Sequence, residues 1–353
     1  MSTPLQPTTP AELAEAVRSA PRVLAVGAGT KSRMSRVAAD VVKISTAKLR
    51  GVVEYEPSEF TFTALAGTPV REIVATLGER GQYLPFDPLF SAAGATLGGT
   101  LASGVSGPGR FRFGGLRDFV LGVRFVDGGG RLMRLGGKVV KNAAGFDLPK
   151  FLVGSVGRFG ALAEITFKVF PRPLATRTLR LELTDVAAMT EMFATAGSAR
   201  WELDALEASP GERAVYARLA APAPALDALT KEIFSRWPGA VLADEAAMKL
   251  WSDVSEAAWA HAGGTLVKVA LTPSQVPKFV AGLPTAARCW ISAGGNAGYL
   301  SLPADVALPT LGWPAVTLRG EAALWAGVQP RFEVMRQVKA ALDPQNRFPN
   351  LDD

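Results

Sequence analysis

Apolar and polar positions repeat with two different periods along the first half of the chain, and these periods predict its elements. Helical spacing predicts a helix over 11–19, and Thr68-Pro69 begins a second helix that ends near Gly81. Runs rich in β-branched and aromatic residues predict strands over 23–26, 41–44, 51–55, 60–66 and 161–170. A hairpin is predicted from 121–126 and 131–135, joined by a glycine-rich turn.

The pattern changes after Pro171-Arg172-Pro173, which marks a domain boundary. Downstream of it, strands are predicted over 178–183, 213–219, 265–271 and 288–292, and helices over 186–196, 225–234, 273–281 and 331–341. This alternation predicts an α+β lobe with an antiparallel sheet. The sequence therefore predicts an α+β protein with a first domain over 1–173, a smaller cap domain over 174–320, and a C-terminal helical segment over 321–353.

The segment Gly27-Ala28-Gly29-Thr30-Lys31-Ser32 directly follows the first predicted strand. It is no P-loop, because Thr30 stands where that motif needs glycine before the lysine. It is no Rossmann fingerprint, because Ser32 replaces the third glycine and Asp40 precedes the next strand instead of ending it. Two interpretations stay open: an ordinary tight turn, or a nest whose backbone N–H groups bind a pyrophosphate beside the charge of Lys31.

A second glycine-rich segment covers 85–115, and almost every residue over 95–104 is small. A flat dinucleotide can lie against such a backbone because no large side chain stands in the way. Leu97, Leu101 and Val105 recur every four residues, which is not typical of a flexible linker. A tightly packed glycine-rich loop without a ligand is the alternative.

Composition limits the chemistry of the chain. It holds one cysteine, Cys289, and one histidine, His261, which excludes an internal disulfide, an iron–sulfur cluster held by this chain alone and a multi-histidine metal site. Residues 1–175 contain 22 Lys and Arg against 13 Asp and Glu, with the excess greatest over 110–141. That region is either an anion site or a solvated basic face, and without interleaved aromatic residues it does not indicate nucleic acid. Neither a secretory signal nor a membrane-spanning run is visible, so a cytoplasmic location is expected.

Three blocks carry a resemblance to a known family: 27–32, then 94–99 through 113–118, and then 136–148 running on into 154–162. They resemble the vanillyl-alcohol-oxidase-type (PCMH-type) FAD-binding family, and within it the FAD-binding subunits of bacterial glycolate oxidases. Lys141-Asn142, followed by Ala-Ala-Gly-Phe-Asp-Leu, is similar to the glycolate oxidase subunits in particular. The resemblance covers about 20–172, weakens across the second lobe and returns at 338–344.

The resemblance implies an FAD-binding domain of two small subdomains that enclose an extended FAD, a cap lobe, and a C-terminal helix that returns to the FAD domain. Lys141 and Asn142 become candidates near the flavin or substrate, with fixing their own loop as the alternative role. The residues that the resemblance implies for cofactor binding are Gly27, Ala28, Gly29, Thr30, Lys31, Ser32, Ala95, Thr96, Gly98, Gly99, Ala102, Ser103, Gly107, Gly114, Gly160 and Ile165.

The chain departs from the family in ways that change the expected chemistry. Residues 1–172 contain neither histidine nor cysteine, the types through which many members attach FAD, so noncovalent attachment is expected. His261 is interpreted as a surface or capping residue, with a general base as the alternative. Arg319 is a further candidate that could reach the site from the cap. The tail reads Phe348-Pro349-Asn350 where family tails often read Asn-Pro-Gly.

The function expected from the resemblance is a noncovalent FAD-binding subunit of a glycolate (2-hydroxy acid) oxidase complex. Its expected partners are a catalytic flavin subunit and an iron–sulfur subunit, with a small 2-hydroxy acid as substrate and peripheral attachment to the inner face of a membrane through those partners. Two alternatives stay open: a self-sufficient FAD-dependent 2-hydroxy acid dehydrogenase, and a structural subunit that keeps the fold without flavin.

Overall fold

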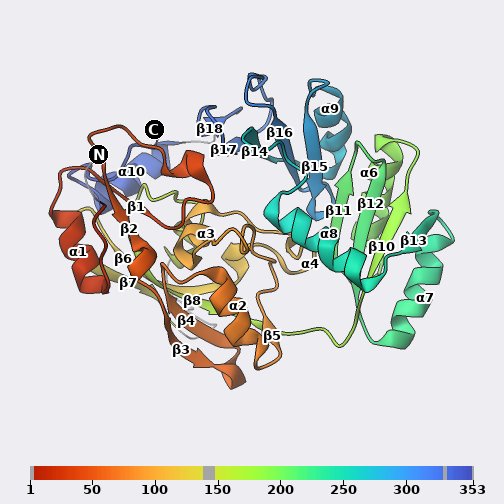
Figure 1. The fold of residues 1–353 in the computed structure, drawn as a ribbon, viewed down its shortest axis with the longest axis horizontal. Helices are drawn as coiled ribbons and strands as arrows, with labels where there is room; N and C mark the ends of the chain where they lie inside the picture. The colour runs from red at the N-terminus through yellow and green to blue at the C-terminus, as the bar shows by residue number, and fades with distance from the viewer. Residues whose placement is uncertain (1–3, 138–147, 329–331, 352–353) are drawn as a thin grey trace. The chain divides into compact units, whose positions relative to one another are not determined.

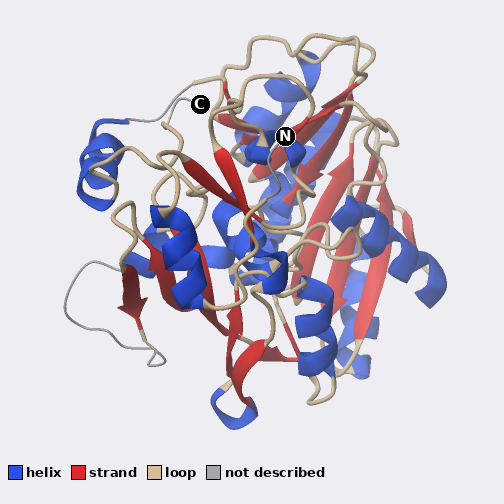
Figure 2. Ribbon diagram, turned by 60° about the vertical axis from the view of Figure 1, so that its left-hand side comes forward, coloured by secondary structure: helices blue, strands red, loops and turns tan. Residues whose placement is uncertain are grey.

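The computed structural model describes residues 4–137, 148–328 and 332–351. The chain divides into two compact units (Figure 1): Met1–Val105, Gly115–Pro171 and Pro330–Asp353 form the first, and Ser106–Gly114 and Arg172–Gln329 form the second. Both units combine helices with antiparallel sheets (Figure 2), which confirms the predicted α+β class. Within the described ranges, no helix is both long enough and apolar enough to span a membrane.

The first unit contains a small parallel sheet and a larger antiparallel one. In the small sheet, β1 (Val23–Val26) pairs with β2 (Val42–Ser45), and α1 (Pro10–Arg18) packs its buried Leu13 and Val17 into the same apolar core. The larger sheet has the order β3 (Val52–Glu56), β4 (Thr61–Leu65), β8 (Ala161–Lys168), β6 (Val120–Val126) and β7 (Leu132–Gly136). The short strands β5 (Gln82–Tyr83) and β9 (Phe170–Pro171) pair with each other in a separate two-stranded antiparallel sheet.

Helix α3 (Leu97–Ser103) forms inside the segment that the sequence indicated only as small-residue backbone. Its first turn is capped by the Thr96 hydroxyl, which accepts from the Gly99 N–H at 3.2 Å. A Cβ on Gly98 would lie 2.8 Å from the Cβ of Ala66, so glycine is needed there for close packing, although it lowers helix propensity. Tertiary contact therefore outweighs local propensity in this helix. The other helices of the unit are α2 (Val70–Gly78), α5 (Leu148–Phe151) and α10 (Phe332–Leu342).

The second unit is built on one antiparallel sheet of nine strands. Helices α6 (Val186–Ser198), α7 (Ala223–Phe234) and α9 (Val276–Ala281) share one apolar core with this sheet, and α8 (Asp244–Glu256) packs on its other face through Trp251. The strand order is β13 (Gly239–Val241), β10 (Thr176–Glu182), β12 (Ala214–Ala220), β11 (Leu203–Ser209), β15 (Arg288–Ser292), β16 (Ala297–Leu302), β14 (Thr265–Ala270), β17 (Ala315–Arg319) and β18 (Trp325–Ala326).

Segment Ser106–Gly114 corrects the expected domain division, which assigned it to the first domain. It contains the short helix α4 (Arg110–Phe113), and Phe111 packs against the core of the second unit. A Cβ on Gly294 would lie 2.7 Å from the Phe111 ring, so the absence of a side chain at Gly294 makes room for the aromatic ring. The apolar surface of Phe111 thus draws this segment into the second unit.

Removing the Phe111 ring should destabilise the second unit, because it leaves a cavity against the core. We expect Phe111→Ala to lower the free energy of unfolding by about 2 kcal/mol. All seven tryptophans lie in the second unit, so urea unfolding followed by tryptophan fluorescence reports on that unit. An unchanged tryptophan transition in Phe111→Ala would refute this packing, and Phe62→Ala in the first unit serves as the comparison.

Candidate functional site

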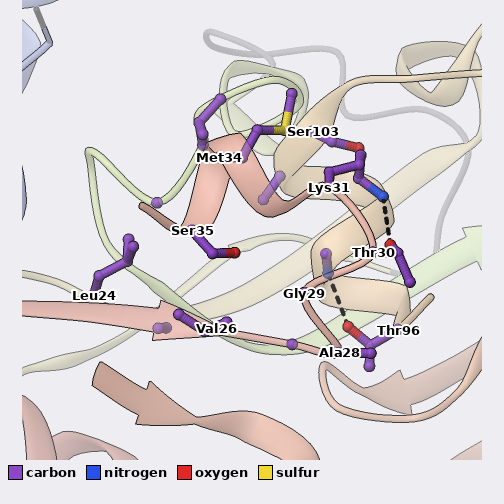
Figure 3. A pocket seen from close by; sticks show the side chains of 16 residues that line it. Leu24, Val26, Ala28, Gly29, Thr30, Lys31, Met34, Ser35, Thr96 and Ser103 are labelled. Atoms are coloured by element: carbon purple, nitrogen blue, oxygen red, sulfur yellow. Dashed lines mark hydrogen bonds between the residues drawn. The ribbon is translucent and has the colours of Figure 1, made fainter. Parts of the chain in front are cut away.

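A pocket opens in the first unit where β1 ends (Figure 3). Its cavity volume of about 70 Å³ is enough for a few water molecules, so it can hold one polar portion of a large ligand. Its lining combines the loop after β1, one side of α3 and a turn before β8. The lining residues are Leu24, Ala25, Val26, Gly27, Ala28, Gly29, Thr30, Lys31, Met34, Ser35, Thr96, Gly99, Ala102, Ser103, Val156 and Gly157.

Gly27 sets how closely the loop after β1 approaches α3. A Cβ at this position would lie 2.2 Å from the Oγ1 of Thr96, a distance that no side chain can occupy. Gly29 has φ +69°, in the left-handed region that glycine adopts readily. The end of β1 is further fixed by the Thr46 hydroxyl, which donates to the carbonyl of Val26 at 3.3 Å. The two glycines therefore let bare backbone form one side of the pocket.

The free backbone donors of the pocket lie in this loop and not at the start of α3. The N–H groups of Leu97 and Gly98 already donate to the carbonyls of Thr68 (2.9 Å) and Ala66 (2.7 Å), and that of Gly99 donates to the Thr96 hydroxyl. Among the described residues, by contrast, no protein acceptor faces the N–H of Ala28 or Gly29. Consecutive unpaired N–H groups in such a loop form an anion-binding nest.

Lys31 brings a positive charge to the same wall. Its side chain is only 7% exposed, and its ammonium lies 5.3 Å from the centre of the Phe90 ring and 3.4 Å from the Thr30 hydroxyl (Figure 3). The aromatic face and the hydroxyl hold the ammonium in place within a poorly solvated region, where its charge acts strongly on a neighbouring anion. The nest and Lys31 together fit a phosphate or pyrophosphate group.

Val156 and Gly157 form a wall that the sequence did not indicate as part of the site. Val156 has φ +48°, which is strained for a β-branched residue, and its N–H donates to the carbonyl of Ala102 at 2.8 Å. Gly154 and Gly157 also have positive φ, at +80° and +69°. These closely spaced glycines are the signal in the sequence that could have pointed to this turn.

The predicted cofactor residues fall into four groups. Nine line the pocket: Gly27, Ala28, Gly29, Thr30, Lys31, Thr96, Gly99, Ala102 and Ser103. Ser32, Ala95 and Gly98 adjoin the lining in sequence without belonging to it. Gly160 is packed against Phe125 and Ile165 is fully buried, so neither lines the pocket, whereas Gly107 and Gly114 belong to the second unit. Lys141 and Asn142 lie outside the described residues.

The pocket lies in a part of the chain that is similar to a known family. Residues 4–136 match the family described as FAD binding domain, and this range contains the loop, Lys31 and α3. This part of the chain is therefore similar to FAD binding domains. The predicted resemblance is thereby confirmed over residues 4–136, and the nest of Ala28 and Gly29 fits a pyrophosphate such as the one that FAD carries.

The chain is also similar to several curated relatives over part of its length. The chain is 46% identical to "Glycolate oxidase subunit GlcE" of Escherichia coli over 160 residues. This aligned stretch covers 45% of this chain and 44% of that protein. It is 32% identical over 141 residues to "Glycolate oxidase subunit GlcD" of Bacillus subtilis (39% and 30%), and 30% identical over 165 residues to "D-2-hydroxyglutarate dehydrogenase" of Xanthomonas citri (46% and 34%). The matches thus span less than half of the length of these relatives.

The fold of the whole chain also has a solved counterpart. A structure of alkyldihydroxyacetonephosphate synthase superposes with a TM-score of 0.67 over 97% of this chain and 74% of that chain, at 16% sequence identity. At this identity the likeness establishes the fold and carries no statement about substrate. It supports the predicted α+β fold.

The second unit carries a polar cluster on the sheet face opposite its apolar core. Glu207 is fully buried and accepts hydrogen bonds from Trp290 Nε1 (2.7 Å), the Ser292 hydroxyl (2.7 Å) and the Ala293 N–H (3.0 Å). Tyr299 donates its hydroxyl to the carbonyl of Ser106 at 3.3 Å. These bonds satisfy the buried carboxylate and hold segment 106–114 against the sheet.

Lys268 stands opposite Tyr299 in the register of β14 and β16. Burial, reinforced by the charge of Arg110, lowers the pKa of Lys268 from 10.5 to about 8. Burial also lowers the pKa of Arg319 from its ordinary value, partly offset by the charge of Glu256. A lysine with such a pKa has a substantial neutral fraction near pH 8 and can exchange protons there.

His261 and Cys289 have no place in the pocket. The ring Nε2 of His261 lies 3.0 Å from the carbonyl of Ala286, and its backbone N–H donates to the Ser301 hydroxyl at 2.9 Å. Burial raises the pKa of the Cys289 thiol to about 12, so its reactive thiolate is scarce at neutral pH. The contacts of His261 are those of a residue that fastens a loop to the sheet.

Substituting Gly27 should abolish the loop geometry and with it flavin binding. A Cβ there must displace either Thr96, which caps α3, or the nest itself. We expect Gly27→Ala to retain less than about a tenth of the wild-type FAD content, measured by absorbance after gel filtration with added FAD. Gly197→Ala in α6 is the matched control, since a Cβ there meets nothing within 4 Å. Full flavin content in Gly27→Ala would contradict the assignment.

The lowered pKa of Lys268 predicts a pH dependence of stability. Above pH 8 the folded state has released a proton that the unfolded state, with an ordinary lysine, still binds, so the free energy of unfolding rises with pH. We expect wild type to gain on the order of 1 kcal/mol relative to Lys268→Met between about pH 8 and 9.5. Urea titrations at several pH values measure this gain, and parallel curves for the two proteins would exclude it.

Proposed function

We propose that this chain is a noncovalent FAD-binding subunit of a glycolate (2-hydroxy acid) oxidase complex. The observation that carries the proposal is the nest of Ala28 and Gly29 beside Lys31, set in residues that match the FAD binding domain family. The relatives named as glycolate oxidase subunits and as a 2-hydroxy acid dehydrogenase favour a 2-hydroxy acid as substrate.

In this proposal the chain contributes binding and orientation. The N–H groups of Ala28 and Gly29 hold the pyrophosphate, and the Lys31 ammonium offsets its charge. Gly99 and Ala102 present a wall of small residues on α3, along which the rest of an extended dinucleotide leaves the small pocket. FAD, when bound, would supply a two-electron carrier that can relay electrons within the complex. Lys141 and Asn142 stay candidates for the flavin side, where an ammonium and an amide can hold a carboxylate.

The absence of histidine and cysteine from residues 1–172 supports noncovalent attachment. Precipitation of the FAD-loaded protein with trichloroacetic acid tests this point. We expect all of the yellow flavin in the supernatant, because hydrogen bonds and packing do not survive denaturation. Flavin that stays in the pellet would require a covalent link through another residue type.

The proposal assigns catalysis and onward electron transfer to partners. Cys289 alone cannot provide the thiolates of an iron–sulfur cluster, so such a cluster would belong to a separate subunit. A second flavin subunit would oxidise the substrate, in keeping with the two subunit names among the relatives. Attachment to the inner face of a membrane would then occur through these partners.

A self-sufficient 2-hydroxy acid dehydrogenase is the second candidate, and Lys268 is the observation that favours it. Such an enzyme needs a base in its own chain, and the lowered pKa of Lys268 gives that amine a neutral fraction near pH 8. His261 is a weaker choice because its ring contacts the Ala286 carbonyl. The third candidate, a subunit that keeps the fold without flavin, leaves the unpaired donors of the nest without a role.

Anaerobic addition of glycolate or D-lactate to the FAD-loaded chain separates the three candidates. We expect a flavin absorption band that stays oxidised with the chain alone, because the proposal places substrate oxidation in a partner subunit. Bleaching of the band would instead support the self-sufficient dehydrogenase, with Lys268→Met as the first variant to examine. Failure to take up FAD at all would leave the structural subunit.

A further inference from the structure

A buried ion pair lies next to the cofactor pocket without lining it. Lys339 on α10 and Asp343 just beyond the helix are both almost fully buried, and Lys339 Nζ lies 2.8 Å from Asp343 Oδ2. Desolvating two charges is costly, and an apolar pair of similar size often stabilises a fold equally well. Stability alone therefore does not account for this pair, and its hydrogen bonds to neighbouring segments indicate a further role.

Lys339 reaches the strained wall of the pocket through one intermediate residue. Besides Asp343, its ammonium donates to the carbonyls of Arg158 (2.9 Å) and Phe348 (3.2 Å), so all three of its donors have partners. The guanidinium of Arg158 in turn donates to the carbonyl of Val156 at 2.6 Å. Val156 is the lining residue with φ +48°, and such a backbone persists only where the surroundings fix it.

Asp343 reaches a second wall of the pocket, β1, through the tail that follows α10. Its carboxylate accepts from the N–H groups of Arg347 (2.8 Å) and Phe348 (2.9 Å), which fixes the course of the tail. The carbonyl of Arg347 then accepts from the N–H of Val23 at 2.7 Å, at the first residue of β1. The Arg347 guanidinium also donates to the carbonyl of Ala20 at 2.6 Å.

One buried pair thus connects two walls of the pocket. Val156 and Gly157 form one wall, and β1, which runs directly into the nest, forms the adjoining wall. We propose that Lys339 and Asp343 are positioning residues that set the distance between these two walls and thereby the affinity for FAD. The inference rests on FAD being the ligand, as in the proposed function, and it assigns the last residues of the chain a role without any contact with the cofactor.

Lys339→Met tests this role, because methionine keeps the length of the side chain and removes its three donors. If the competent pocket falls to about a tenth of the population, the Kd for FAD rises about tenfold. Flavin fluorescence quenching on the full chain, well below the unfolding temperature, measures this Kd. Amide hydrogen exchange without FAD should quicken at 23–27 and 156–158, while β6 and β7 keep their wild-type rates.

Phe62→Ala is the matched control for a merely structural effect. It removes a buried ring from β4, in the same unit and far in sequence from both walls. It therefore lowers stability without changing the Lys339–Asp343 pair and its hydrogen bonds, which we call the brace. We expect its Kd for FAD to stay within about twofold of wild type. An equal rise of Kd in Phe62→Ala and Lys339→Met would overturn the proposal, as would a wild-type Kd in Lys339→Met.

Arg347→Ala keeps the proposal testable if Lys339→Met does not fold. It removes the side-chain bonds to Ala20, Arg18 and Gln345 and leaves the buried pair intact, so a smaller rise in Kd, about threefold, is expected. Failure of the wild type to bind FAD would refute the proposed function and not this brace. In that case faster exchange at both walls in the variant still supports the brace, and unchanged exchange refutes it.

Discussion

The close approach of the loop after β1 to helix α3 is the constraint on which the first unit depends. A Cβ at Gly27 would collide with the hydroxyl that caps α3, and a Cβ at Gly98 would collide with Ala66 at the end of β4. Two glycines therefore allow strand, loop and helix to meet without intervening side chains. The consequence is a pocket bounded on two sides by backbone and small residues, with its donors in the loop.

The ligand-binding groups of this site are mainly backbone N–H groups. The conformation of that backbone must therefore be fixed by residues that do not line the pocket. Ala28 and Gly29 contribute N–H groups, and only Lys31 contributes a full charge to the lining. Neither the loop nor the left-handed turn at Val156 is a regular element, and the turn is held by hydrogen bonds from its backbone to Ala102 and from Arg158 to its carbonyl. The buried pair of Lys339 and Asp343 supplies this support from the end of the chain, more than 300 residues after β1 in sequence.

Much of the fold and part of the site could be predicted from the sequence. The period of apolar residues located α1, β1 and the hairpin of β6 and β7 within one or two residues, because those elements bury a regular face. Local pattern did not locate β11, in which Asp204 and Glu207 are buried polar residues paired by tertiary contacts. It also did not identify α3 as a helix, although Leu97 and Leu101 are four residues apart, because glycine has low helix propensity and its two glycines are explained by packing against Ala66 and Thr96.

For the site as well, residues marked by a local sequence pattern were predicted, and residues positioned by tertiary contacts were not. The loop from Gly27 to Lys31 was predicted because its glycines stand directly after a strand, whereas Val156 was missed because its strained backbone leaves no trace in residue type. Gly160 and Ile165 were predicted from resemblance alone, and the structure places them in the packing of β6 and β8. The family match over 4–136 confirms the resemblance in that range, while the domain bounds and the individual ligand contacts stay predictions.

The central claim is that the nest after β1 receives the pyrophosphate of FAD. Amide hydrogen exchange of the full chain with and without saturating FAD tests it most directly, because the claim concerns individual N–H groups. The account predicts that exchange slows most at Ala28 and Gly29, and next at Val156 and Gly157 on the adjoining wall. Slowed exchange confined to other parts of the chain, with Ala28 and Gly29 unchanged, would contradict it.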